Sequence, residues 1–214
     1  MSPLPFQAQR QQVIDTCLRL ADQGYLAGTG GNVALRVDDA HFAVTPSAAD
    51  YYGLRPAQIA VLRLDTLAQV SGDMKPSVES AMHATLLRRW PARPASVHTH
   101  QPVASALALL GQALPLTEAD DVAALGPRVE LVPYAPSGTA LLVRGLRRRL
   151  SDGIHAYLLR NHGLICTGPG LDEAAQLVAR IEAAAALWLL QQAGQLPAKH
   201  PLRRRAEAAL TTST

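Results

Sequence analysis

The chain has 214 residues, 48% of them hydrophobic, which is enough to bury a core and within the size range of one domain. A formal net charge of +3 with only 4% aromatic residues argues against a base-stacking nucleic-acid surface. Two cysteines, Cys17 and Cys166, are too few for a disulfide framework, and no apolar run approaches the roughly 20 residues of a membrane span. We therefore expect one cytoplasmic domain over residues 1–214, with its core at about residues 10–192, a loose C-terminal tail, and no nucleic-acid or membrane partner.

The N-terminal part of the chain predicts a helix that leads into a glycine-rich loop. Apolar residues recur at helical spacing from Phe6 to Gly24, where the glycine is a stop signal. The loop that follows is Gly28-Thr29-Gly30-Gly31-Asn32. Its glycines would let backbone N–H groups surround an anion such as phosphate, although a turn that merely needs positive φ is the more frequent explanation.

Three short strands are expected next. Val33–Val37 and His41–Thr45 have strand character and are joined by a turn at Asp38-Asp39. Ile59–Leu64 is a third apolar strand, and Val70–Asp73 is expected to be a loop.

A helix is predicted from Pro76 to about Trp90. Ser77 is placed to cap it, and Glu79 falls in the first turn, where a carboxylate interacts favourably with the helix dipole. Glu79 and His83 are four residues apart on one helical face, so they could pair with each other or share an ion. The alternative is that Glu79 is only a first-turn acid.

A strand at Ala95–His100 ends in His-x-His. Side chains two apart on a strand point to the same face, so the imidazoles of His98 and His100 can converge on one ion. Two histidines do not make a site, and a metal would need at least one further ligand from elsewhere in the chain.

The remaining elements alternate between helices and short strands. In chain order they are a helix at Gln101–Leu110, a stretch at Leu114–Leu125 that carries Glu118, Asp120 and Asp121, a strand at Val129–Val132, a helix at Thr139–Leu150 with Arg147-Arg148-Arg149 facing outward, strands at Ala156–Arg160 and Leu164–Thr167, and a closing helix at Leu171–Gln192. The alternation predicts an α/β fold with a mixed, largely antiparallel sheet.

The bend Asn161-His162-Gly163 lies between the last two strands and presents the ring of His162 near strand ends. Together with His98 and His100, it would supply three neutral imidazoles and leave a fourth tetrahedral position open, which is the arrangement of a catalytic zinc site. We expect His41, His155 and His200, which lie in turns or in the tail, to face solvent.

Five motifs in order resemble those of the class II aldolase/adducin superfamily, and in particular its fuculose-phosphate aldolase branch. They are Gly28–Asn32, Val44-Thr45-Pro46-Ser47, Lys75-Pro76-Ser77-Val78-Glu79 with His83, His98-Thr99-His100 and Asn161-His162-Gly163-Leu164. The likeness runs from about Arg10 to Leu190. It implies a single-domain, three-layer α/β sandwich that assembles as a homotetramer with each site near a subunit interface.

The resemblance also implies a lyase that cleaves a ketose 1-phosphate to dihydroxyacetone phosphate and an aldehyde. A Zn²⁺ ion, or another divalent metal, would be held by His98, His100 and His162 and would stabilise the enediolate. Glu79 would be the acid/base and could approach the metal when substrate is absent. The substrate's phosphate would lie among residues of three segments, namely Gly31, Asn32, Thr45, Ser47 and Ser77.

The sequence departs from this pattern at points that bear on the reaction. Val78 stands where relatives have a second hydroxyl residue, and Ala48 where they have glycine. Fuculose-phosphate aldolases use tyrosines as additional proton donors, one in the mid-chain loop and one near the C-terminus. This chain has no tyrosine after Tyr157. Its mid-chain loop offers Glu118, Asp120 and Asp121 instead of a tyrosine. Dehydration, 4-epimerisation or decarboxylation at the same site, or a non-catalytic adducin-like module, are therefore the alternatives.

Overall fold

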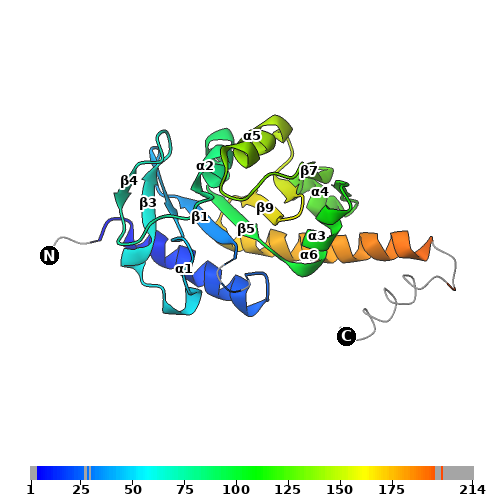
Figure 1. Ribbon diagram of the computed structural model, residues 1–214, viewed down its shortest axis with the longest axis horizontal. Helices are drawn as coiled ribbons and strands as arrows, with labels where there is room; N and C mark the ends of the chain where they lie inside the picture. Colours follow the sequence, from blue (N-terminus) through cyan, green and yellow to red (C-terminus); the bar gives the residue numbers. More distant parts are fainter. Residues whose placement is uncertain (1–3, 27, 29, 196–198, 200–214) are drawn as a thin grey trace.

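The computed structural model describes residues 4–26, 28, 30–195 and 199, and its strands form one central sheet (Figure 1). The strand order is β4-β3-β2-β1-β5-β9-β8-β7-β6, and every neighbouring pair is antiparallel except β7 and β8. The strands are β1 (Asn32–Arg36), β2 (His41–Val44), β3 (Ala60–Arg63), β4 (Gln69–Ser71), β5 (Ala95–Thr99), β6 (Leu114–Pro115), β7 (Arg128–Val132), β8 (Ala156–Leu159) and β9 (Gly163–Gly168).

Helices cover both faces of this sheet, which confirms the predicted three-layer α/β fold. They are α1 (Gln7–Asp22), α2 (Ser80–Arg89), α3 (Pro102–Leu109), α4 (Ala119–Leu125), α5 (Ala140–Arg149) and α6 (Leu171–Gly194), with short 3₁₀ turns at Tyr51–Gly53 and Pro56–Gln58. In Figure 1, α2 and α5 lie above the sheet, whereas α1 and α6 lie below it.

The face covered by α1, α3 and α6 holds the largest apolar cluster. Val33 of β1 and Val97 of β5 pack there with Ile14 of α1, Leu107 of α3 and Ile181 of α6. Since alternate strand residues point to opposite faces, the neighbours of Val33 on β1 and of Val97 on β5 point toward α2.

The opposite face carries two smaller clusters. Ala34 and Phe42 pack against Leu87 of α2, while Ile165 of β9 packs against Leu142 of α5. The histidines expected to bind a metal lie on this second face or at its edge, beside α2 and the loop before α5.

The segment expected to be a loop at Val70–Asp73 begins within a strand, so that prediction was wrong in part. Gln69–Ser71 forms β4, which pairs with β3 at the edge of the sheet. The chain reverses just before it, where Leu67 adopts φ +62° and its N–H reaches the carbonyl of Arg63 at 3.0 Å. No glycine or asparagine marks this turn, which is why the pattern did not reveal it.

Helix α2 begins later than predicted, at Ser80, and Glu79 is its N-cap residue rather than a first-turn acid. The extended backbone before it is held by a bridge between Pro46 and Pro76 and by a 3.0 Å hydrogen bond from the Ser77 N–H to the Thr45 carbonyl. The Ser77 hydroxyl still supports the start of the helix, because it accepts the Glu79 N–H at 3.2 Å.

Two of the histidines expected to face solvent are partly buried. His155 lies before β8 with its ring edge-on to Trp90 at 5.1 Å between centroids, and His41 begins β2 with its Nδ1 3.0 Å from Asp38. Arg147, Arg148 and Arg149 are exposed, as predicted. His200, Thr29 and residues 203–205 lie outside the described residues, as does most of the expected tail.

Both cysteines are free buried thiols. Within the described ranges, no helix combines the length and the apolar character that crossing a bilayer would require.

Candidate active site

Three histidines meet at the end of β5. The Nε2 atoms of His98 and His100 are 3.0 Å apart, and the ring of His162 lies 4.7 Å from that of His98 and 5.0 Å from that of His100, between centroids. One ligand nitrogen from each ring can be chosen so that all three lie within 4.8 Å of one another. We call these residues the three-histidine cluster.

Sheet register explains why distant residues meet here. Strands β5 and β9 pair with His98 opposite Ile165 and Thr99 opposite Leu164, so the bend before β9 lies beside the end of β5. At Gly163 a Cβ atom would overlap the Thr99 carbonyl oxygen and lie 2.8 Å from Cδ2 of His100. Only glycine allows the bend to approach this closely, and the approach brings His162 to the other two rings.

The hydrogen-bond chemistry of the cluster fits a cation. Nδ1 of His98 lies 2.7 Å from the carbonyl of Leu164, which can only accept, so Nδ1 carries the hydrogen and a neutral ring points its Nε2 lone pair into the cluster. Burial, reinforced by the neighbouring His98, lowers the pKa of His100 and of His162 to about 4, so both rings are neutral near pH 7. Neutral imidazoles that present lone pairs to one point are the donor set that Zn²⁺ and similar metals prefer.

Glu79 faces the cluster with both carboxylate oxygens engaged. Oε1 accepts the hydroxyl of Ser137 at 2.7 Å and lies 3.2 Å from Nε2 of His162. Oε2 accepts the side-chain amide of Asn32 at 2.8 Å and lies 3.2 Å from Nε2 of His98. The contacts with the histidines require a proton or a metal ion between electron-rich atoms, which again fits a cation site.

These contacts keep Glu79 ionised although it is buried. Burial alone would raise its pKa, but the contact with His98 and the hydrogen bonds from Asn32 and Ser137 together hold the pKa well below its usual range. The side chain is therefore a buried carboxylate beside a cluster of metal-ligand type, with Asn32 and Ser137 as its two neutral donors. We call Asn32, Glu79 and Ser137 the carboxylate clamp.

The residues expected to bind phosphate come from segments that the fold brings together. The Thr45 and Ser77 segments are joined as described above, and the Ser47 N–H reaches the Lys75 carbonyl at 3.0 Å. The Thr45 hydroxyl is fully buried and accepts the Val33 N–H at 3.3 Å, whereas Ser47 is partly exposed.

Gly31 lies between these segments and the cluster with φ +83°. A Cβ there would overlap Leu26 and lie 2.8 Å from the His98 carbonyl oxygen, and its own carbonyl accepts the Tyr51 hydroxyl at 2.6 Å. Ala48 adopts φ +52°, a left-handed conformation that an alanine adopts at some cost.

The acidic residues of the mid-chain stretch lie at the start of α4, with Glu118 as its N-cap residue. Glu118 and Asp120 are exposed, and the carboxylate of Asp121 is paired with Arg180 of α6 at 2.5 Å. Within the described part of the chain, none of the three makes a hydrogen bond or ion pair with the three-histidine cluster or with Glu79.

The sequence pattern did not reveal Ser137, which lies 58 residues from Glu79 in the loop between β7 and α5. The only local signal was the Ser-Gly turn: Gly138 has φ +70°, and a Cβ there would lie 3.1 Å from Cγ2 of Val78. The loop thus closes tightly on the residue beside Glu79.

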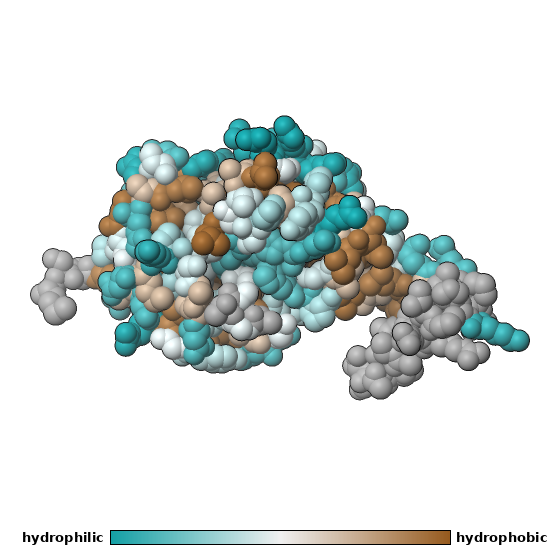
Figure 2. All heavy atoms as spheres, in the orientation of Figure 1, coloured by the Kyte–Doolittle hydropathy of each residue, from teal (hydrophilic) through white to brown (hydrophobic). Residues whose placement is uncertain are grey.

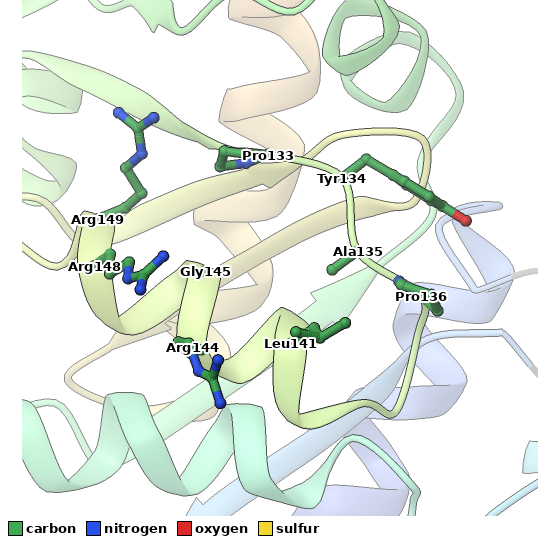
Figure 3. Close-up of a pocket in the computed structure, with 9 residues that line it drawn as sticks. All are labelled: Pro133, Tyr134, Ala135, Pro136, Leu141, Arg144, Gly145, Arg148 and Arg149. Atoms are coloured by element: carbon green, nitrogen blue, oxygen red, sulfur yellow. The ribbon is translucent and has the colours of Figure 1, made fainter.

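The other side of the same loop borders a basic hollow of about 550 Å³. Figure 3 shows Arg144, Arg148 and Arg149 projecting from α5, while Tyr134 points away from the arginines. No histidine of the three-histidine cluster lines this hollow, so the hollow is separate from the site that contains the cluster and Glu79.

Comparisons with known proteins show which family the chain resembles. Residues 11–189 match the model of the class II aldolase and adducin N-terminal domain. The chain is 32% identical over 183 residues to a 5-deoxy-D-ribulose 1-phosphate aldolase from Bacillus thuringiensis serovar kurstaki, with 85% of this chain and 84% of that protein covered. It is 28% identical over 190 residues to a 3-oxo-tetronate 4-phosphate decarboxylase from Haemophilus influenzae, with 86% and 89% covered.

Among solved structures, an L-fuculose 1-phosphate aldolase superposes with a TM-score of 0.83 at 26% identity, with 96% of this chain and 95% of that chain covered. The match spans the strands that carry the cluster and the helix that follows Glu79. The chain therefore belongs to the class II aldolase and adducin family.

Proposed function

We propose that the protein is a Zn²⁺-dependent lyase that cleaves a ketose 1-phosphate by retro-aldol reaction to dihydroxyacetone phosphate and an aldehyde. The observation that carries the proposal is a cluster of three imidazoles, two of which, His98 and His162, contact the ionised, buried Glu79. The sugar-phosphate aldolases among the relatives support the same reaction class.

His98, His100 and His162 would hold the cation, and Glu79 could approach it in the absence of substrate. A divalent cation there supplies positive charge that stabilises the oxyanion developing at the C2 carbonyl. Cleavage breaks the C3–C4 bond: the Glu79 carboxylate would accept the C4 hydroxyl proton as C4 becomes the aldehyde, and the electron pair passes to C3. Glu79 would then deliver that proton to C3, and the clamp keeps its side chain in place for both transfers.

The phosphate would lie against the backbone of Gly31 and the partly exposed Ser47, with Ser77 in the extended segment before α2. Glycine-rich loops and helix N-termini present N–H groups to anions. The buried Thr45 hydroxyl and the Asn32 amide are engaged within the protein, so we assign them mainly to holding the loop and Glu79.

Decarboxylation of a 3-oxo sugar-acid phosphate is the second candidate. Loss of CO₂ from such an acid also leaves an electron pair on the carbon next to a ketone, and that carbon again takes a proton. Unlike retro-aldol cleavage, it requires no group to accept a hydroxyl proton. The lack of tyrosines after Tyr157 and the decarboxylase among the relatives favour this alternative.

We further propose that the protein is a cytoplasmic homotetramer. Exposed leucines support assembly: Leu109 and Leu110 at the end of α3 and Leu187 of α6 are each more than half exposed, and Figure 2 shows an apolar area over the α3–α6 region. Exposed apolar patches of this kind mark contact surfaces.

The test is a product screen with the zinc-loaded enzyme. Ketose 1-phosphates, unphosphorylated ketoses and 3-oxo sugar-acid phosphates are supplied in turn, and aldehyde and CO₂ are measured separately. Aldehyde release from a ketose 1-phosphate supports the proposal, and CO₂ release alone supports the second candidate. Turnover that is unchanged after zinc removal would contradict both.

A further inference from the structure

His83 is buried and takes no part in the chemistry described so far, yet both of its ring nitrogens have partners. Nδ1 lies 2.7 Å from the Ser96 hydroxyl, and Nε2 lies 2.5 Å from Oδ1 of Asn32. The other end of the Asn32 amide donates to Glu79. A continuous hydrogen-bonded chain therefore runs from Ser96 through His83 and Asn32 to the carboxylate.

The donor and the acceptor of each hydrogen bond in this series can be assigned from the Glu79 end. An ionised carboxylate only accepts, so Asn32 must present its NH₂ group to Glu79 and its Oδ1 to His83. His83 must then carry its hydrogen on Nε2, and a neutral ring accepts the Ser96 hydroxyl at Nδ1. Burial, with a smaller contribution from His98, lowers the pKa of His83 to about 3 against the opposing effect of Glu79, so the ring is neutral.

The sheet places the chain where an apolar layer would otherwise continue. Asn32 pairs with His98 and Ala34 pairs with Ser96 across β1 and β5, and α2 closes over this face. Buried polar groups without partners are costly, and apolar residues at positions 83 and 96 would leave Oδ1 of the buried Asn32 without the partner it has in His83.

We propose that His83 is a positioning residue that fixes Asn32 in the one amide orientation able to hold Glu79. If Asn32 rotated by half a turn, its carbonyl oxygen would face the carboxylate and repel it. The inference rests on the proposed function in one respect, namely that Glu79 moves the substrate proton. It also gives His83 a role other than direct pairing with Glu79.

The test compares His83→Met with His83→Gln in the zinc-loaded, full-length enzyme. The two side chains have similar length, but only glutamine offers an N–H near the place of Nε2. We expect kcat to fall roughly 10- to 100-fold in H83M, with KM changed by less than about twofold, because misplacing a catalytic group affects the transition state more than binding. H83Q should recover most of the loss, to within about fivefold of the unmodified enzyme.

Folding and metal content are measured in parallel by thermal unfolding and zinc analysis. A loss of kcat in both variants to the same degree, or normal turnover in H83M, would overturn the inference. A merely structural role would lower the melting temperature of both variants without the difference in kcat.

A second measurement does not depend on any substrate. Imidazole ¹⁵N NMR of the metal-free protein should show His83 as the neutral Nε2–H tautomer at pH 7. The Nδ1–H tautomer would overturn the hydrogen-bond chain even if the enzyme were an active aldolase. If no substrate in the screen were turned over while the Nε2–H tautomer was found, the proposed function would fail and the arrangement of the chain would stand.

Discussion

The three-histidine cluster and the carboxylate clamp touch each other, but they are built differently. Strand register and one close-packed glycine place the histidines, and both are properties of the central sheet. The clamp is assembled from a strand end, a helix N-cap and a loop, which are far apart in the sequence. We infer that the sheet determines the positions of the histidines, whereas the clamp depends on how a helix start and a loop pack against it.

Removal of a histidine from the cluster should have the largest effect. His162→Ala deletes one of three imidazoles, and we expect a loss of zinc affinity greater than the roughly 10- to 100-fold that outer-shell changes cost. Bound zinc is measured after dialysis, together with turnover. His41→Ala is the matched control, because that ring pairs with Asp38 and lies outside the cluster. Full zinc retention in H162A would contradict its role as a ligand.

Glu79→Gln should break the clamp and leave the cluster intact. The amide keeps the shape of the side chain but cannot move a proton, so we expect kcat to fall by about 10²- to 10⁴-fold. Zinc content should remain near that of the unmodified protein. Normal turnover in this variant would remove Glu79 from the mechanism.

Ser137→Ala should have a smaller effect, because it removes one of the two neutral donors of the clamp. The Ser137 hydrogen bond lowers the pKa of Glu79, so its loss raises that pKa. If the carboxylate form is the active one, the acid limb of the kcat/KM profile moves to higher pH, and kcat at pH 7 falls by about 3- to 10-fold. Ser137→Thr, which keeps the hydroxyl, is the control. A shift of the acid limb to lower pH would be the wrong sign.

Ala48→Gly should have the smallest effect and the opposite sign. It relieves a left-handed alanine at φ +52°, so we expect stabilisation by about 1 kcal/mol in urea unfolding. Ala123→Gly on exposed α4 is the control and should destabilise by about 0.5–1 kcal/mol, because glycine weakens a helix interior. Equal effects of the two changes would show that backbone strain at Ala48 is negligible.

The sequence predicted the three-histidine cluster better than the carboxylate clamp. The period-two spacing of His98 and His100 predicted their common direction, and the bend at His162 was visible between two apolar strands. The start of α2 was missed because a tertiary bridge between Pro46 and Pro76 keeps the preceding residues extended.

The contact of Ser137 with Glu79 and the pairing of Asp121 with Arg180 were missed for a related reason. Each joins residues nearly 60 positions apart, and no local pattern encodes such a pairing. Periodicity therefore revealed the parts of the site that the sheet determines, and tertiary packing of loops decided the rest.

The central claim is that the cluster and Glu79 together control the carbon next to a ketone, and proton exchange tests it most directly. Both candidate reactions can leave the electron pair on the carbon that becomes C3 of dihydroxyacetone phosphate. The zinc-loaded enzyme in D₂O should therefore exchange a hydrogen at C3 of that compound, followed by ¹H NMR, and exchange should cease without zinc or in Glu79→Gln. Absence of exchange in the zinc-loaded enzyme, or exchange that survives both changes, would contradict the account.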